Sequence, residues 1–184
     1  MPSYVQFDVW QNTAGVTRTA VLQTKVTYSD TKSSWSANST WVEPSTDYRV
    51  TITPTFTTSL IVVNYYIPMN IYWTGASNCE HMVRCIRNVG GVRSFPSSAG
   101  GTLGSRNTIA GHTYRPPGYD YNDCQTENLT VVDVPATLSA VTYSIEFLQE
   151  NSNVPTNYMG YTASDNSSWG FSSRMIIVAQ EIAQ

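Results

Sequence analysis

The chain has 184 residues, enough for a domain with its own hydrophobic core, and only 12% of them are charged, against about a quarter in an average soluble protein. The net charge of −3 and the ten scattered lysines and arginines form no clustered basic face, which excludes nucleic acid as an expected partner. No stretch reaches the ~20 apolar residues of a membrane helix, and the first residues do not resemble a signal peptide. We therefore expect one domain over residues 1–184, made in a reducing cytoplasm and without a membrane partner.

Apolar and polar residues alternate with period two along most of the chain, and no window has the spacing of an amphipathic helix. The sequence therefore predicts an all-β protein. The predicted strands are residues 4–10, 20–28, 48–53, 60–67, 82–87, 129–134, 142–148 and 174–182. About eight strands of this length suit two packed sheets, which is a β-sandwich of the jelly-roll type.

The first predicted strand belongs to a candidate N-terminal arm, residues 1–10. An unpaired terminal strand readily adds to the edge of another sheet, so Tyr4, Val5 and Phe7 are candidate contacts with a partner. A stretch rich in Ser, Thr and Asn follows at residues 33–45 and carries Trp35 and Trp41. Tryptophans fill cores and interfaces or, when exposed, stack against sugars. Burial is favoured for the tryptophans in general, and these two are the candidates for exposure or for a subunit contact.

Two predicted strands have one apolar and one polar face. In residues 48–53 the apolar face consists of Tyr48, Val50 and Ile52. In residues 142–148 it consists of Tyr143, Ile145 and Phe147, whereas Thr142, Ser144 and Glu146 point the other way. We expect the apolar faces in the core and the polar faces in water.

Two other predicted strands, residues 60–67 and 174–182, are apolar on both faces. In the second, Met175, Ile177 and Ala179 alternate with Ile176 and Val178. A strand of this kind must be covered on both sides. We expect the two strands side by side at the centre of a sheet, covered on one side by the second sheet and on the other by the curl of the sheet or by an identical subunit.

Three cysteines and two histidines are the possible ligands for a soft metal. Cys79, His81 and Cys85 can share one face of a strand, but a zinc site needs a fourth ligand, from His112 or Cys124. A free cysteine is more often a small buried apolar residue, and a disulfide from Cys79 or Cys85 to Cys124 is the other alternative. We expect no metal and no cofactor.

Catalytic signals are also weak. His81 and His112 are the only histidines that could act as a general base for a nucleophile, and no Gly-x-Ser-x-Gly elbow is present. A glycosidase needs two facing carboxylates, which the linear sequence does not pair among Asp120, Asp123, Glu127, Asp133, Glu146 and Asp165. We expect no catalytic residues and no enzyme activity.

Residues 88–123 are dense in Gly and Pro and predict a long loop with one short strand near residues 108–114. The loop carries Tyr114, Tyr119 and Tyr121 among Gly, Asn and Asp, which is a composition typical of recognition surfaces. These tyrosines are candidate partner contacts. The alternative is a lid that packs on its own subunit.

Four segments resemble a domain found in structural proteins of tailed bacteriophages, especially marine and cyanobacterial ones. They are residues 46–54 (TDYRVTITP), 58–65 (TSLIVVNY), 133–147 (DVPATLSAVTYSIEF) and 175–182 (MIIVAQEI). The shared pattern is an ITP strand end, a Ser-x-Ile-Val strand, an Asp-x-Pro turn before a Tyr-x-Val/Ile strand, and a terminal Glu-Ile. The resemblance covers most of the chain from about residue 40 onward.

This resemblance implies a homotrimer of jelly rolls, similar in shape to the heads of C1q and tumour necrosis factor, on the virion surface. The family domain usually ends a long fibre, whereas here the first predicted strand lies close to Met1, and the tyrosine-bearing loop has no counterpart. We therefore expect a capsid decoration (cement) protein, made in the host cytoplasm, that binds the major capsid protein. The alternative is a tail-fibre head whose tyrosine loop recognises a host surface receptor, a glycan or a protein.

Overall fold

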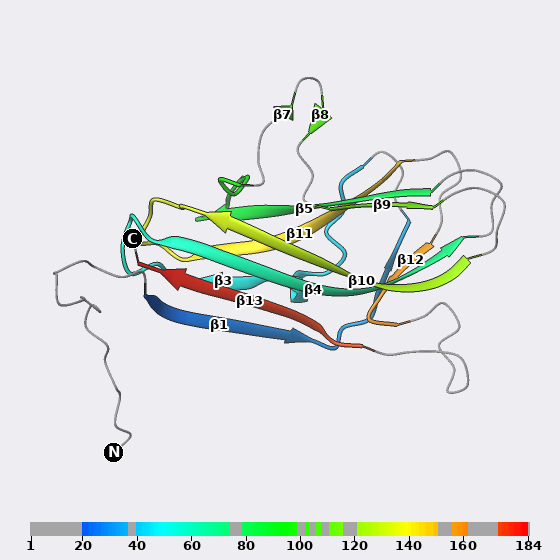
Figure 1. Cartoon of the computed structure of the whole chain (residues 1–184), viewed down its shortest axis with the longest axis horizontal. Coiled ribbons are helices and arrows are strands. Elements are labelled where there is room, and N and C mark those ends of the chain that lie inside the picture. Colours follow the sequence, from blue (N-terminus) through cyan, green and yellow to red (C-terminus); the bar gives the residue numbers. More distant parts are fainter. Residues whose placement is uncertain are drawn as a thin grey trace, which may run out of the picture.

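The computed structural model describes residues 20–36, 40–73, 79–98, 102–103, 106–107, 111–115, 121–150, 156–161 and 173–183. Two antiparallel sheets pack face to face (Figure 1). The first contains β1 (Val21–Ser29), β13 (Met175–Ile182), β4 (Leu60–Trp73), β12 (Thr156–Met159), β2 (Ser33–Trp35) and β10 (Tyr121–Asp133). The second contains β3 (Val50–Ile52), β11 (Val141–Glu150), β5 (Cys79–Val89), β6 (Val92–Ser94) and β9 (Gly111–Arg115).

The remaining elements are short. Strands β7 (Thr102–Leu103) and β8 (Arg106–Asn107) pair with each other, and a single 3-10 turn, η1 (Thr46–Tyr48), precedes β3. The described part of the chain has no α-helix. The predicted all-β sandwich is therefore confirmed, and its two-sheet antiparallel architecture is consistent with a jelly roll.

Strands β4 and β13 lie side by side, as their doubly apolar sequences predict. Their register pairs Ile177 with Tyr65 and Ala179 with Val63. These four side chains are 1% exposed or less and point toward the second sheet. The inner row of β13 is thus a core row, and its other row, Ile176 and Val178 included, stays partly exposed on the far side.

The second sheet supplies the other half of the core. Tyr48, Val50 and Ile52 are at most 1% exposed, and so are Tyr143, Ile145 and Phe147, which confirms both predicted apolar faces. Trp35 is also a core residue, because it is 7% exposed and its ring lies 4.9 Å from that of Phe147. The expectation that Trp35 is exposed or contacts another subunit does not hold in this structure.

The outer face of β11 is not wet, contrary to expectation. Ser144 is 6% exposed and Glu146 only 4%. Val42, before β3, extends the edge of the sheet beside β11 through two backbone hydrogen bonds with Phe147, each 2.8 Å. The ring of the adjacent Trp41 lies over the outer face, 4.0 Å from the guanidinium of Arg84. The polar residues of β11 are therefore buried against charged and aromatic neighbours.

The long loop predicted at residues 88–123 is interrupted by several strands. Strand β5 continues to Val89, turns through Gly90 and Gly91, and pairs with β6. Both glycines have positive φ values, 58° and 89°, which suit a tight two-residue hairpin turn. The short strand expected near residues 108–114 is β9, and β10 begins at Tyr121. Local Gly and Pro content misled the prediction because strand pairing across the sheet overrides it.

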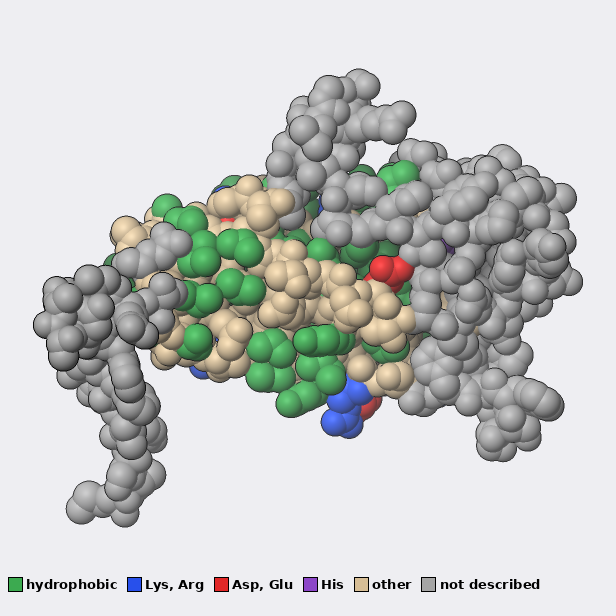
Figure 2. Space-filling model, viewed as in Figure 1, with side chains coloured by type: hydrophobic (Ala, Val, Ile, Leu, Met, Phe, Trp, Pro, Cys, Tyr) green, Lys and Arg blue, Asp and Glu red, His purple; other side chains and the backbone are tan. Residues whose placement is uncertain are grey.

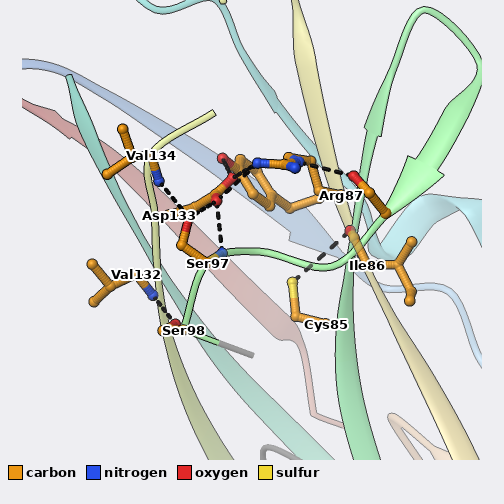
Figure 3. Close-up of polar contacts among 10 residues, drawn as sticks. Cys85, Ile86, Arg87, Ser97, Ser98, Val132, Asp133 and Val134 are labelled. Atoms are coloured by element: carbon orange, nitrogen blue, oxygen red, sulfur yellow. Dashed lines mark hydrogen bonds and ion pairs between the residues drawn. The ribbon is translucent and has the colours of Figure 1, made fainter. Parts of the chain in front are cut away.

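A buried ion pair ties the two sheets together near the end of β10 (Figure 3). Asp133, 0% exposed, accepts hydrogen bonds from Arg87 at 3.0 and 3.2 Å and from the hydroxyl of Tyr143 at 2.8 Å. The backbone N–H and hydroxyl of Ser97 donate to it at 2.8 and 3.0 Å. Every oxygen of this buried carboxylate is thus satisfied, which offsets the cost of removing it from water.

Candidate assembly surface

The outer face of the first sheet carries an array of uncharged side chains on four of its strands. The ladder register aligns four rows across β1, β13, β4 and β10. The rows are Tyr28–Ile176–Tyr66–Asn128, Val26–Val178–Asn64–Thr130, Thr24–Gln180–Val62–Val132 and Val21–Ile182–Leu60. None of these rows contains a charged side chain.

Several apolar side chains in these rows are exposed to solvent. Val21 is 55% exposed, Val26 44%, Tyr28 60% and Tyr66 47%. In Figure 2, hydrophobic side chains gather over β1 and toward the end of the sandwich at which the C-terminus lies. Four strands about 4.8 Å apart and seven residues long give a footprint of roughly 450 Å². Ten of the fifteen side chains in the rows are apolar, and the largest apolar patch on a typical monomer, about 300–600 Å², is often functional, so this face is a candidate interaction site.

Charge appears at the rim of this face. Arg174 and Asp30 form a bidentate ion pair at 2.6 and 2.7 Å beside Tyr28, and the guanidinium lies 5.8 Å from the centre of that ring. The hydrogen bond from Arg174 lowers the pKa of Asp30, and the same contact raises the pKa of Arg174. An uncharged centre with a polar rim is the usual anatomy of a protein interface.

A buried carboxylate fixes the position of β13 under the outer face. Glu181, 0% exposed, accepts hydrogen bonds from the side chains of Gln23 (2.5 Å) and Ser59 (2.6 Å) and from the backbone of Thr55 (2.5 Å). Burial raises the pKa of Glu181, but the hydrogen bonds from Ser59, Gln23 and Thr55 together lower it by more. The pKa therefore lies below its ordinary value. The ionised group therefore joins β1, β13 and the loop at residues 53–59.

The second sheet presents a different outer face. Arg84 donates to one oxygen of Glu146 at 2.6 and 2.8 Å, and Arg93 donates to the other. The guanidinium of Arg84 also lies over Trp41 and 5.3 Å from the ring of Phe95. This face is thus covered by its own ion pairs and aromatic rings, whereas the outer face of the first sheet has no such cover among the described residues.

One end of the sandwich continues the uncharged surface. The loops at residues 53–59 and 134–140 both lie there, because Ile52 pairs with Val141 and Asp133 with Ile61. The chain enters β1 and leaves β13 at this same end, where the N–H of Ala183 donates to the carbonyl of Ala20. The two loops contain no charged residue and carry Phe56, 53% exposed, and Leu138, 58% exposed. We call these loops, with Ala20 and Ala183, the uncharged end.

The candidate contacts predicted from sequence are not gathered at this surface. Tyr4, Val5, Phe7 and Tyr119 lie outside the described residues. Tyr114 belongs to β9 and Tyr121 begins β10, so neither sits in a long loop. Trp41 is half-buried under Arg84. Sequence reasoning flagged Ile176 and Val178 through the doubly apolar pattern of β13, but it missed Val26, Tyr28 and Tyr66, whose exposure depends on which face each strand turns outward.

The described residues place several of the possible metal ligands and catalytic groups. No three His, Cys, Asp or Glu side chains among them lie close enough to hold a metal ion. Cys85 is a free, buried thiol, which rules out a disulfide from this residue, and burial raises its pKa to about 12. Of the carboxylates considered for catalysis, Asp133 and Glu146 are buried in ion pairs with arginines. In the same part of the chain, no helix is long and apolar enough to span a membrane.

Comparisons with known proteins identify no family for this chain. No family model matches the sequence, and no curated protein is similar to it. Among solved structures, the subunit of Bacillus endospore appendages, described as disulfide-linked pili, is similar with a TM-score of 0.35 and 10% identity, over 88% of this chain and 93% of that one. A chain in the structure of the infectious bursal disease virus Gx strain is similar with a TM-score of 0.37 and 10% identity, over 91% of this chain and 37% of that one. A chain of the VP2 subviral particle of infectious bursal disease virus is similar with a TM-score of 0.36 and 10% identity, over 99% of this chain and 44% of that one. The chain thus spans less than half the length of these viral chains, and at these scores no function is transferred from any of the three proteins.

Proposed function

We propose that this protein is a non-enzymatic structural subunit of a phage virion surface that assembles as a homotrimer and decorates the capsid. The observation that carries the proposal is the uncharged outer face of the first sheet. A sandwich that works alone keeps such a face polar, so this one is suited to burial against other copies of the chain. The sequence resemblance to phage structural domains supports the placement on a virion.

Assembly through this face is consistent with the charge distribution. The Arg174–Asp30 pair lies at its rim, and the opposite sheet is closed by Arg84, Arg93 and Glu146. Homo-oligomers use closed symmetry, and burial of apolar side chains between copies supplies the free energy. A decoration protein then stabilises the capsid by binding the assembled lattice and adding contact area between its subunits. The function in this proposal is binding, and no catalytic step is involved.

Two measurements test the proposal. Mass photometry of the purified full chain should give three times the protomer mass. Quantitative mass spectrometry of purified particles should give a copy number comparable to that of the major capsid protein. A copy number that is a small fraction of the capsid protein, together with binding to host cells, would identify a receptor-binding head instead. A monomer that is absent from particles would overturn the proposal entirely.

A further inference from the structure

The uncharged end of the sandwich carries exposed apolar side chains with no cover among the described residues. Phe56 and Leu138 are each more than half exposed, and Val134 at the start of the second loop is 38% exposed. Loops usually carry polar and charged residues, since they face water. Two apolar-tipped loops at one end, beside the point where the chain enters β1, therefore form a surface that fits an apolar partner.

The chain itself contains a segment that matches this surface. Residues 1–19 precede Ala20, which lies at the uncharged end. Within them Val5, Phe7 and Val9 alternate with Gln6 and Asp8, the pattern of a strand with one apolar face. Asp8 and Arg18 are the only charged side chains of this segment. An apolar strip of this kind complements an uncharged surface without desolvating a charge.

The connecting segment is long enough for the strip to come from a neighbouring copy. Residues 11–19 can span up to about 30 Å when extended. A strand that folds back on its own sheet needs a turn of only about 2–5 residues. The longer, Gly-containing link is sufficient to reach the next subunit of an oligomer, and the exchange of identical elements between copies costs little because the contacts are the same.

We infer that the uncharged end of each subunit binds residues 4–10 of a neighbouring copy, with Phe7 packed against the loops that carry Phe56 and Leu138. The inference rests on the proposed assembly and adds a second contact between copies. The outer face of the first sheet holds the subunits together, and the exchanged segments fasten them at the end where the chain enters and leaves the sandwich.

Photocrosslinking of the full chain tests this contact. The substitution Phe7→p-benzoylphenylalanine should give, on irradiation, an adduct of two chains whose crosslinked peptide contains residues 53–59 or 134–140. The matched control is Gln6→p-benzoylphenylalanine, which places the probe on the opposite side of the strip and should give little of this adduct. The double substitution F56D/L138D should lower the yield of the adduct at least about tenfold. Charge on both loops should weaken the binding of the segment by more than about 1.4 kcal/mol, the free energy that corresponds to a tenfold change in affinity.

The outcomes separate this inference from the proposed function. A crosslink within one chain would mean that the segment covers its own subunit, and a crosslink elsewhere or none would mean that the uncharged end has another partner; each overturns the inference. Mass photometry of the same samples reports assembly independently. An oligomer without the two-chain adduct refutes the exchanged segment alone, whereas a monomer refutes the proposed assembly as well.

Discussion

The substitution Val26→Asp tests the assembly surface most directly. Val26 lies in the second of the four uncharged rows, beside Val178 of β13, and is 44% exposed in the single chain. If another copy covers this face, the substitution removes the burial of about half a valine side chain, worth about 1 kcal/mol. It also buries a carboxylate without a partner, which costs about 3–5 kcal/mol.

The two effects together weaken each contact by about 4–6 kcal/mol, which corresponds to a factor of about a thousand or more in the dissociation constant. At micromolar concentration we expect the V26D protein to be a monomer in mass photometry and in sedimentation velocity, whereas the unsubstituted protein is a trimer. The fold should survive, because the side chain lies on an edge strand and is already half in water.

The matched control is Val92→Asp. Val92 is also an exposed valine in a strand, 70% exposed, but it belongs to β6 on the second sheet. This variant should remain a trimer. Tyr28→Asp, in the adjacent outer row, should dissociate as V26D does and provides a second variant if V26D folds poorly. Trimers of unchanged stability in both V26D and Y28D would refute the assignment of this face as the subunit interface.

Three further predictions concern the buried polar groups. The pKa of Glu181 is lowered in the folded protein, so the carboxylate contributes its full stabilisation above its ordinary pKa of 4.5 and loses it as the pH falls below that value. Urea unfolding of E181Q should therefore show a loss of about 2 kcal/mol at neutral pH and a weaker pH dependence below pH ~5 than the unsubstituted protein; equal slopes would contradict this. The substitution Arg84→Ala should lower the free energy of unfolding by about 3 kcal/mol, because it removes the less exposed partner of Glu146. The substitution Arg93→Ala, at a side chain that is 54% exposed, should lower it by less than about 1 kcal/mol. The reverse order would show that the pairing is misassigned. Cys85, with its pKa raised to about 12 by burial, should resist alkylation at pH ~8 until urea unfolds the chain, as peptide mapping would reveal, and rapid labelling of the native protein would count against its burial.

The sequence predicted the core rows of the sandwich because the information is local. In a strand, successive side chains point to opposite faces, so the alternation around Tyr143 and Ile145 assigned both residues to the core before any partner strand was known. The doubly apolar runs likewise placed β4 and β13 side by side, and their pairing confirms it. These predictions required only the period of the strand and the cost of exposing apolar side chains.

The errors arose where the outcome depends on distant residues. Trp35 lies in a Ser-rich stretch that suggested exposure, yet it packs on Phe147, more than a hundred residues away. Glu146 follows the polar period of its strand and was expected in water, but Arg84 and Trp41 cover it. Residues 88–123 have the composition of a loop, and cross-strand pairing of β5, β6 and β9 makes much of this segment part of a sheet.

For the candidate assembly surface too, part of the information is local and part depends on distant residues. The residues of β13 alone show that this strand is apolar on both sides and needs cover on both, because a strand's period and apolar content are fixed residue by residue. The packing of the strands shows in addition that β1, β4 and β10 turn uncharged rows to the same side as Ile176 and Val178, and that the loops at residues 53–59 and 134–140 meet at one end. Ladder register and strand order are set by contacts between segments far apart in the chain, and those contacts decide which apolar side chains remain on the surface.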